Sequence, residues 1–186
     1  MNLLLTTKNS HKIEEIKQVL KDKAITLITL SDLNDEETIE ETGKTFQENA
    51  LLKAKYYGDK HNLLSLSDDS GLEVFSLNNQ PGVHSHRYGK THEEANQRLM
   101  KAIEGKDPKA RFTTVLCLYN PKTNEHHFYE GHLYGKIINT PRGHHGFGYD
   151  PIFLLDSNQT LAELTLKEKT AISHRSIALN KLRGDL

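Results

Sequence analysis

Three helix-start signals divide this chain into segments with different patterns of apolar residues. Each is a capping box, in which a threonine is followed three residues later by a glutamate: Thr45 with Glu48, Thr91 with Glu94, and Thr165 with Glu168. The threonine side chain of such a box accepts a backbone N–H of the first helical turn, so each box predicts where a helix begins. Runs rich in β-branched and aromatic residues separate these signals and predict strands. This mixture indicates an α/β fold.

The segment before the first capping box also alternates between strand and helix. Residues 2–6 predict a strand, and Asn9 or Ser10 is a helix cap ahead of an apolar repeat at helical spacing. The apolar run at 24–30 predicts a second strand. An acidic loop, 31–43, is expected to connect that strand to the next helix.

The helix after the first capping box has two distinct faces. Its apolar face is formed by Phe46, Ala50, Ala54 and Tyr57. Asn49 and Lys53 are four residues apart, so they share a different face of that helix. A predicted strand over 63–67 then runs directly into Asp68 and Asp69.

The second half of the chain is predicted to be richer in strands. A helix begins after Thr91, and Gly105 is expected to end it. An antiparallel meander follows, with strands at 110–119, 126–134 and 135–139. A glycine-rich loop, 140–151, precedes a final helical stretch. We therefore expect a single domain over 1–186, with a mixed elongated sheet flanked by helices and two lobes that share a central substrate cleft.

The composition of the chain limits which ligands, cellular location and cysteine chemistry can be expected. The 24 Lys and Arg residues nearly balance the 25 Asp and Glu residues, for a formal net charge of -1, so a small anionic ligand fits better than nucleic acid or an anionic membrane. The apolar run Leu3–Leu5 is too short for a signal-peptide core, and no stretch approaches a membrane span, so a cytoplasmic protein is expected. Cys117 is the only cysteine, which excludes an internal disulfide and thiolate-rich zinc sites.

Familiar nucleotide and metal motifs do not match. The two Gly-Lys-Thr triplets have Thr38 and His84 where a P-loop requires its first glycine. The glycines of the glycine-rich loop are spaced in the reverse order of the dinucleotide fingerprint. Eleven histidines are present, but neighbours such as His126 and His127 point to opposite faces of a strand, which disfavours a histidine metal site.

The adjacent carboxylates Asp68 and Asp69 allow two interpretations. At the end of a strand, one of them could face a hydrated Mg²⁺ ion, which needs only one or two protein carboxylates beside substrate phosphates. Alternatively, the pair belongs to a polar turn in which Gly71 supplies a positive φ angle. The residue types alone favour neither interpretation.

Six segments, taken in order, decide between them: TTKNSHK, EETGKTFQENALLKAK, SDDSGLEV, PGVHSHRYG, GFGYDPIF and EKTAISHR. With these segments the chain resembles the inosine triphosphate pyrophosphatase family, also called Ham1-like, from about residue 3 to residue 180. The resemblance is closest to the bacterial members. It implies a homodimer that uses Mg²⁺ to hydrolyse ITP, dITP and XTP to the monophosphate and pyrophosphate, which keeps these nucleotides out of nucleic acids.

The resemblance also implies roles for individual residues. Asp69 is the implied catalytic residue and metal ligand, and Glu41, or less favourably Glu40, is the second acidic metal ligand. Asp69 would orient water for attack at the α-phosphorus, while Asp68 gives support. Substrate binding is implied for Thr7, Lys8, Asn9, Ser10, His11, Lys12, Lys53, Ser70, Phe147, Gly148, Tyr149, Asp150, Lys169, His174 and Arg175.

Elementary chemistry agrees with this assignment at both ends of a nucleotide. A helix N-terminus after Thr7 offers N–H groups to a triphosphate, although Lys8 replaces the glycine that is usual in the family. Phe147 and Tyr149 are suited to stacking on a purine, and Asp150 to accepting from ring N–H groups. Donors that face a 6-oxo group would admit hypoxanthine and xanthine and oppose adenine, but this logic does not exclude guanine.

Three alternatives remain at this stage. The nearest is a related pyrophosphatase for modified pyrimidine nucleotides. The second is a nucleotide-binding module that performs no catalysis. The third is an RNA-binding or structural protein that uses the basic C-terminal segment 173–184, which the near-neutral total charge disfavours.

Overall fold

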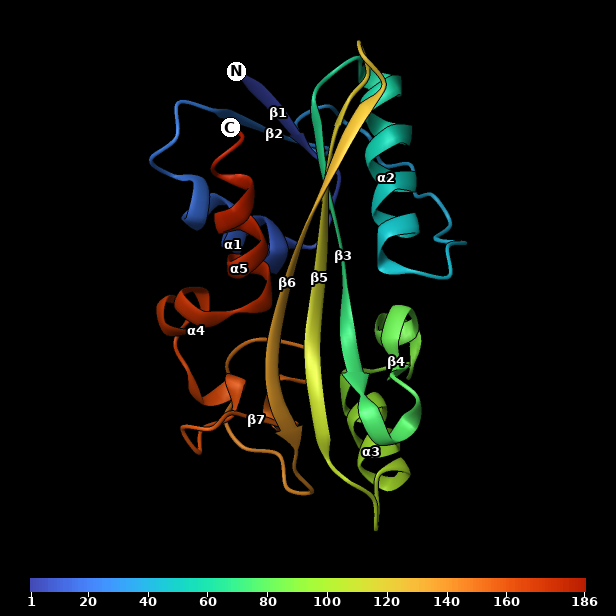
Figure 1. Ribbon diagram of the computed structural model, residues 1–186, viewed down its shortest axis with the longest axis vertical. Coiled ribbons are helices and arrows are strands. Elements are labelled where there is room, and N and C mark those ends of the chain that lie inside the picture. Colours follow the sequence, from blue (N-terminus) through green and yellow to red (C-terminus); the bar gives the residue numbers. More distant parts are fainter. The chain divides into compact units, whose positions relative to one another are not determined.

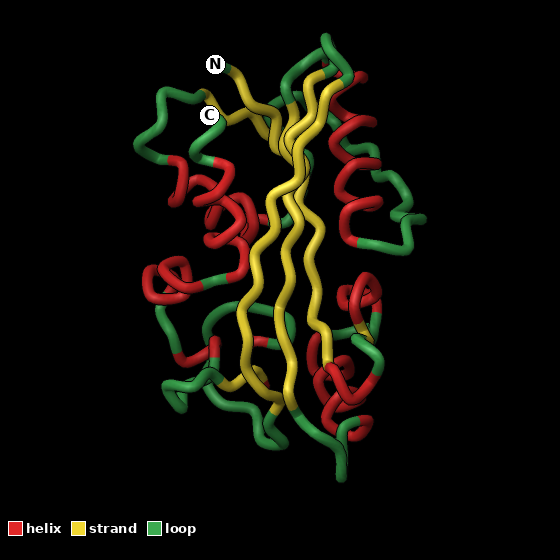
Figure 2. Tube along the Cα trace, viewed as in Figure 1, coloured by secondary structure: helices red, strands yellow, loops and turns green.

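The computed structural model describes all 186 residues and contains a mixed seven-stranded sheet. The strands are β1 (Asn2–Leu5), β2 (Thr26–Thr29), β3 (Ser65–Val74), β4 (Gln80–Pro81), β5 (Lys109–Asn120), β6 (Glu125–Ile137) and β7 (Phe153–Leu154). The α-helices are α1 (Ser10–Leu20), α2 (Phe46–His61), α3 (His92–Ala102), α4 (Leu166–Ile172) and α5 (His174–Leu182) (Figures 1 and 2). None of these helices is both long and apolar enough to cross a lipid bilayer.

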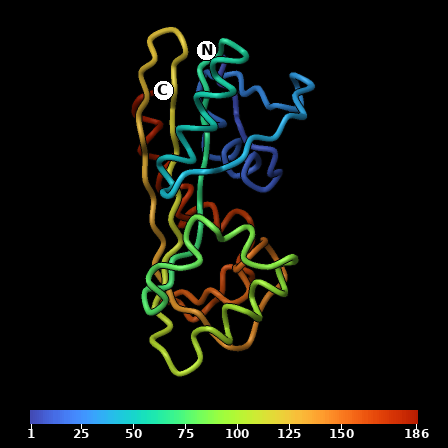
Figure 3. Tube along the Cα trace, turned by 90° about the vertical axis from the view of Figure 1, so that its right-hand side faces the viewer, coloured from blue at the N-terminus to red at the C-terminus, as the bar shows by residue number.

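The strand order is β2-β1-β3-β5-β6-β7, and β4 pairs with β3 beside this path. Strand β1 is parallel to β2 and β3, whereas β4 is antiparallel to β3 and β7 is antiparallel to β6. Strands β5 and β6 are neighbours and form one long hairpin (Figure 3). The expected α/β fold with a mixed sheet flanked by helices is confirmed.

The chain forms two compact units. Unit 1 comprises Met1–Asp69, Thr114–Gly131 and Arg175–Leu186, and unit 2 comprises Ser70–Thr113 and His132–His174. Each unit has a hydrophobic core of its own. A substrate cleft and the organisation as a single domain stay predictions.

Strand periodicity organises the core of unit 1. Leu3 and Leu5 are buried in one cluster with residues of α1 and α5, whereas Leu4 packs in another with Tyr57 of α2. Successive side chains of a strand point to opposite faces, so α2 covers one face of the sheet while α1 and α5 cover the other (Figure 1). Helix α2 begins where its capping box predicts, because both hydrogen bonds between Thr45 and Glu48 are present.

The core of unit 2 brings distant segments together. Leu72 of β3, Leu99 of α3, Phe112 of β5 and Phe153 of β7 are all buried in one cluster. Since these residues are far apart in the sequence, this packing could not be predicted from local patterns.

Two sequence predictions about strands are wrong. The predicted third strand of the meander, 135–139, begins as a continuation of β6. A Cβ at Gly135 would lie 2.6 Å from the Leu154 carbonyl oxygen, so the glycine makes room for β7. Strand β3 likewise continues to Val74, and Gly71 is not among the residues with positive φ, so the alternative of a polar turn is excluded.

Candidate active site

The two adjacent carboxylates point to opposite faces of β3. On the face toward α2, the hydroxyls of Ser65 and Ser67 donate to carbonyl oxygens of that helix at 2.7 and 2.5 Å. Side chains of a strand alternate, so Asp69 shares this face and points toward α2, while Asp68 points toward α1 and α5. Their different surroundings follow from this alternation.

Asp68 belongs to a buried chain of charged side chains. Lys12 Nζ donates to one Asp68 oxygen, and Arg175 Nε donates to the other at 3.0 Å. Arg175 Nη1 also donates to Glu15 Oε2 at 2.8 Å. Burial opposes ionisation of Asp68, but Arg175 and Lys12 outweigh it and hold its pKa well below the usual range. Asp68 is therefore a paired carboxylate that ties helices α1 and α5 to the sheet.

Asp69 has a different electrostatic environment. Its side chain is buried, and Oδ2 has no hydrogen-bond partner. Burial raises the pKa of Asp69 to about 6, although the nearby Lys53 opposes the shift. A buried carboxylate that has a raised pKa and an oxygen without a hydrogen-bond partner is the type of group that accepts a proton or binds a cation.

Lys53 of α2 links Asp69 to the acidic loop. Its Nζ lies 3.6 Å from Asp69 Oδ1, donates to Glu41 Oε1 at 2.5 Å, and donates to the Asp68 carbonyl oxygen at 2.8 Å. Burial alone would lower the pKa of Lys53, but Asp69 and Glu41 raise it. Glu40 is exposed, so Glu41 is the neighbour that reaches this group.

Asn49 holds the loop that carries Glu41, and the sequence analysis gave it no role in the site. The Gly43 N–H donates to Asn49 Oδ1 at 2.7 Å, and a Cβ at Gly43 would lie 2.6 Å from that oxygen. Asn49 is fully buried. Its place one turn before Lys53 is the signal that could have identified it.

Glu15 is a second residue that the sequence analysis missed. It is buried at 1 % exposure and fixes Arg175 by the ion pair described above. It lies one turn after Lys12 and beside Ile16, within the apolar repeat of α1, and an acidic residue in such a repeat was the available signal. Its partner lies at the other end of the chain and could not be inferred.

The predicted phosphate segment forms the start of α1. The Asn9 side chain caps the helix by accepting the N–H groups of His11 at 3.0 Å and Lys12 at 3.3 Å, and Asn9 N–H donates to Thr7 Oγ1 at 3.2 Å. Ser10 is the first helical residue and is exposed. Two N–H groups expected to be available to a ligand are therefore already paired within the protein.

Two other predicted binding residues, Lys8 and Ser70, are at least partly exposed. Lys8 is exposed, and its Nζ donates to the Glu37 carbonyl oxygen at 2.9 Å. Ser70 directly follows Asp69 on β3 and is partly exposed. Lys8 thus contacts the acidic loop in place of the tight backbone approach that the usual glycine permits.

In unit 2, Asp150 organises the glycine loop (residues 140–151). Its Oδ2 accepts the Phe147 N–H at 2.9 Å and Lys169 Nζ at 2.7 Å. Lys169 Nζ also lies 4.8 Å from the centre of the Phe147 ring. Gly146 has φ 76°, and a Cβ there would lie 2.1 Å from Asp150 Oδ2, so only glycine allows this approach. Phe147, Asp150 and Lys169 are therefore brought together in one cluster.

Three other predicted binding residues make contacts within the protein. Tyr149 is 5 % exposed within the core, and its hydroxyl donates to the Ser85 carbonyl oxygen at 2.8 Å, which leaves Phe147 as the accessible ring of the pair. The His174 ring stacks on Phe112 with centroids 4.9 Å apart. Arg175, also predicted to bind substrate, belongs to unit 1, where it pairs with Asp68.

Asp69 and Glu41, the carboxylates near Lys53, are the candidate ligands for a metal ion. No three His, Cys, Asp or Glu side chains come together in a group that could hold a metal. Asp69 and Glu41 nevertheless both pair with Lys53, and Asp69 Oδ2 lacks a hydrogen-bond partner. Mg²⁺ requires only one or two carboxylates when phosphate oxygens and water complete its shell, so this donor set fits that ion.

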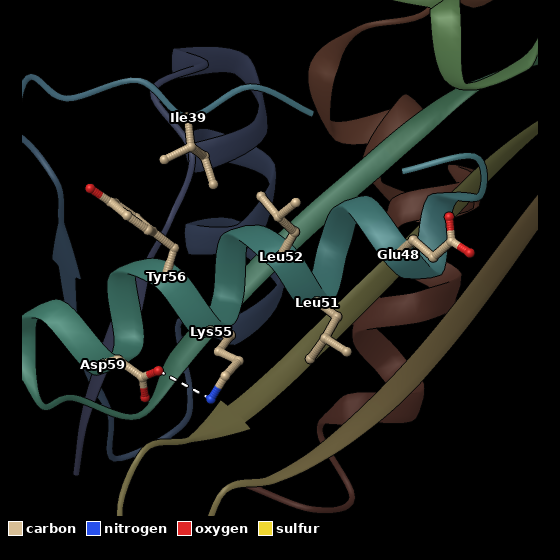
Figure 4. A pocket seen from close by; sticks show the side chains of 7 residues that line it. All are labelled: Ile39, Glu48, Leu51, Leu52, Lys55, Tyr56 and Asp59. Carbon is tan, nitrogen blue, oxygen red and sulfur yellow. Dashed lines mark ion pairs between the residues drawn. The ribbon is translucent and has the colours of Figure 1, made fainter. Parts of the chain in front are cut away.

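A separate pocket lies over the outer side of α2 and contains none of the predicted site residues. It is lined by Ile39, Glu48, Leu51, Leu52, Lys55, Tyr56 and Asp59 (Figure 4). Its two carboxylates are engaged, because Glu48 caps α2 and Asp59 lies 3.1 Å from Lys55 Nζ. The region around Asp69 differs from this pocket in holding a buried carboxylate oxygen, Asp69 Oδ2, that has no hydrogen-bond partner.

Comparison with known proteins identifies the family of the chain. Residues 3–185 match the model of the Ham1 family. The chain is 43% identical over 191 residues to a dITP/XTP pyrophosphatase of Thermoanaerobacter pseudethanolicus, covering 99% of this chain and 96% of that protein. It is 40% identical over 186 residues to a dITP/XTP pyrophosphatase of Bacillus subtilis, covering 96% and 93%.

A solved structure of a HAM1 protein from Coxiella burnetii superposes with a TM-score of 0.92 at 40% sequence identity, covering 100% of this chain and 98% of that one. The Staphylococcus aureus Ham1 protein gives 0.89 at 35% identity, covering 100% and 97%. The fold is therefore that of the Ham1 proteins. Because the family model also matches nearly the whole sequence, the chain belongs to the Ham1 family.

Proposed function

We propose that this protein hydrolyses the non-canonical purine nucleotides ITP, dITP and XTP to the monophosphate and pyrophosphate. Family membership supports the reaction, since relatives 40% to 43% identical are named dITP/XTP pyrophosphatases. The observation that carries the proposal is the state of Asp69, a buried carboxylate with an unpartnered oxygen and a pKa of about 6 beside Lys53.

In the proposed reaction, Asp69 accepts a proton from the water that attacks the α-phosphorus. The new bond joins the water oxygen to the α-phosphorus. The bond to the bridging oxygen breaks, and its electron pair leaves with pyrophosphate. Lys12 and Lys53 place positive charge beside the two carboxylates and stabilise the negative charge that develops on the phosphates.

Asp69 and Glu41 are the proposed ligands of Mg²⁺, together with substrate phosphate oxygens. When bound, the ion would supply further positive charge to the phosphate oxygens. Asp68 is proposed to act by position, because both of its oxygens are already bonded to Lys12 and Arg175.

We assign the purine to the glycine loop. Phe147 is the accessible ring for stacking, and the Lys169 ammonium beside it is a donor for a 6-oxo group. Asp150 already accepts the Phe147 N–H and Lys169, so its first role is to fix the loop. The remaining residues of the start of α1, with Ser70, His174 and Arg175, complete the proposed substrate-binding set.

A pyrophosphate-release assay tests the proposal. ITP, dITP and XTP should be hydrolysed rapidly with Mg²⁺, ATP and GTP slowly, and chelation should abolish the activity. Equal rates with ITP and ATP would refute the proposed base discrimination. A deoxyuridine or thymidine analogue tests the pyrimidine alternative, and binding of ITP without release of pyrophosphate would indicate a non-catalytic module. Sedimentation tests the proposed homodimer.

A further inference from the structure

Three glycines of the glycine loop have left-handed backbone conformations: Gly143 with φ 79°, Gly146 with φ 76° and Gly148 with φ 63°. Gly143 packs against the Ala162 backbone and Gly146 against the Asp150 side chain, but no atom lies within 4 Å of a Cβ built at Gly148. Glycine loses the most backbone freedom on folding, so an ordered conformation there needs contacts other than packing.

Helix α3 supplies those contacts at both polar backbone groups of Gly148. The Gly148 N–H donates to His92 Nδ1 at 3.3 Å, and Asn96 Nδ2 donates to the Gly148 carbonyl oxygen at 3.2 Å. His92 and Asn96 are four residues apart, so they lie on the same face of the first turns of α3. The two side chains thus hydrogen-bond both the N–H and the carbonyl group of Gly148, and we call this pair of hydrogen bonds the grip.

Helix α3, which supplies both hydrogen bonds, is fixed at its start and packs against the core of unit 2. Thr91 Oγ1 accepts the Glu94 N–H at 3.1 Å, which fixes the start of α3 directly before His92. Ala95 and Leu99, on either side of Asn96 in the helix, are buried in the core of unit 2. A site supported by a packed helix is more precise than one supported by a mobile loop.

We propose that His92 and Asn96 are positioning residues that fix Gly148 and thereby hold Phe147 in place for the purine. This inference rests on the proposed function, in which the glycine loop binds the base. Asp150, a residue of the loop, accepts the Phe147 N–H. His92 and Asn96 of α3 bond the neighbouring residue, Gly148, from outside the loop. The residues proposed for water attack belong to unit 1, so loss of the grip should affect substrate binding more than turnover.

Four variants test the grip. His92→Ala removes the acceptor, whereas His92→Asn restores one, because the asparagine Oδ1 and the histidine Nδ1 both lie one bond beyond Cγ. Asn96→Ala removes the donor to the Gly148 carbonyl. Gln97→Ala is the matched control, since Gln97 is exposed on the same helix.

Hydrogen exchange of the peptide covering 144–150 reports on the loop without requiring activity. His92→Ala and Asn96→Ala should exchange faster there than the wild type, and His92→Asn and Gln97→Ala should not. With ITP, the two alanine variants should raise KM roughly 3- to 10-fold, the loss expected for one hydrogen bond, with kcat nearly unchanged. Their preference for ITP over ATP should fall in parallel.

Unchanged exchange in both alanine variants would overturn the proposed grip. Faster exchange with an unchanged KM for ITP would overturn its link to the substrate and the assignment of the base to this loop, while pyrophosphate release by the wild type would still stand. His92 is exposed, so His92→Ala keeps the test decisive even if the buried Asn96→Ala variant fails to fold.

Discussion

Replacement of Glu15 by glutamine should destabilise the protein, although no substrate contact is assigned to Glu15. Glu15, Arg175 and Asp68 are each 1 % exposed, and with Lys12 they form a chain of two anionic and two cationic side chains. Glu15→Gln preserves the shape but leaves Arg175 with one anionic partner and the chain with an excess positive charge. Removing one partner of a buried ion pair is costly because the other charge stays buried.

The structure sets the scale of this loss. Across the 2.8 Å between Arg175 Nη1 and Glu15 Oε2, Coulomb's law at an effective dielectric constant of about 20 gives roughly 6 kcal/mol. Glutamine avoids the desolvation of a charge and still offers an oxygen, which offsets part of this energy. Since breaking buried pairs costs about 3–5 kcal/mol, we expect about 3 kcal/mol for Glu15→Gln.

Thermal and urea denaturation followed by circular dichroism measure the effect. For a chain of this length, a loss of about 3 kcal/mol lowers Tm by roughly 6 to 12 °C. Glu14→Gln is the control, because Glu14 is an exposed neighbour on α1 and its loss should change stability by less than about 0.5 kcal/mol. A Glu15→Gln variant as stable as this control would refute the claim that the buried charges support one another.

Further substitutions test the roles of two loops and the dependence of the unfolding free energy on pH in acid. Asn49→Ala should release the loop that carries Glu41 and leave the Gly43 N–H unpaired, which lowers kcat and destabilises by about 1–3 kcal/mol, measurable by urea denaturation against Lys44→Ala at the exposed position next to Gly43. Gly146→Ala should raise KM for ITP severalfold by displacing the loop, and an unchanged KM would contradict this. Hydrogen bonds from Lys60 and His61 hold the pKa of Asp35 at about 2, below its ordinary value. The ionised Asp35 side chain therefore stabilises the fold above about pH 4, and this contribution is lost as the pH falls through about 2. Asp35→Asn should flatten this part of the curve of unfolding free energy against pH.

Local signals predicted much of the fold. Helices α2 and α4 begin after Thr45 and Thr165, because a capping box acts through residues three apart. The divergence of Asp68 and Asp69 also follows from strand geometry. These features could be predicted because every atom that determines them lies within one short segment.

Contacts between distant segments could not be predicted in the same way. Gly71 is a turn former by itself, but β3 passes through it. The Tyr149 ring is suited to stacking on a base, yet it is buried in a core assembled from several strands. The pair between Glu15 and Arg175 joins residues 160 positions apart, so no local pattern contains it.

The neighbouring carboxylates Asp68 and Asp69 have unequal proposed roles, and paired substitutions test this directly. Asp69→Asn should retain a near-normal Tm but lose at least about 100-fold in kcat for pyrophosphate release from ITP, because it removes the proposed proton acceptor and metal ligand. Asp68→Asn should instead lower Tm, because it leaves Arg175 and Lys12 with less negative charge. Near-normal turnover by a folded Asp69→Asn variant would contradict the central claim.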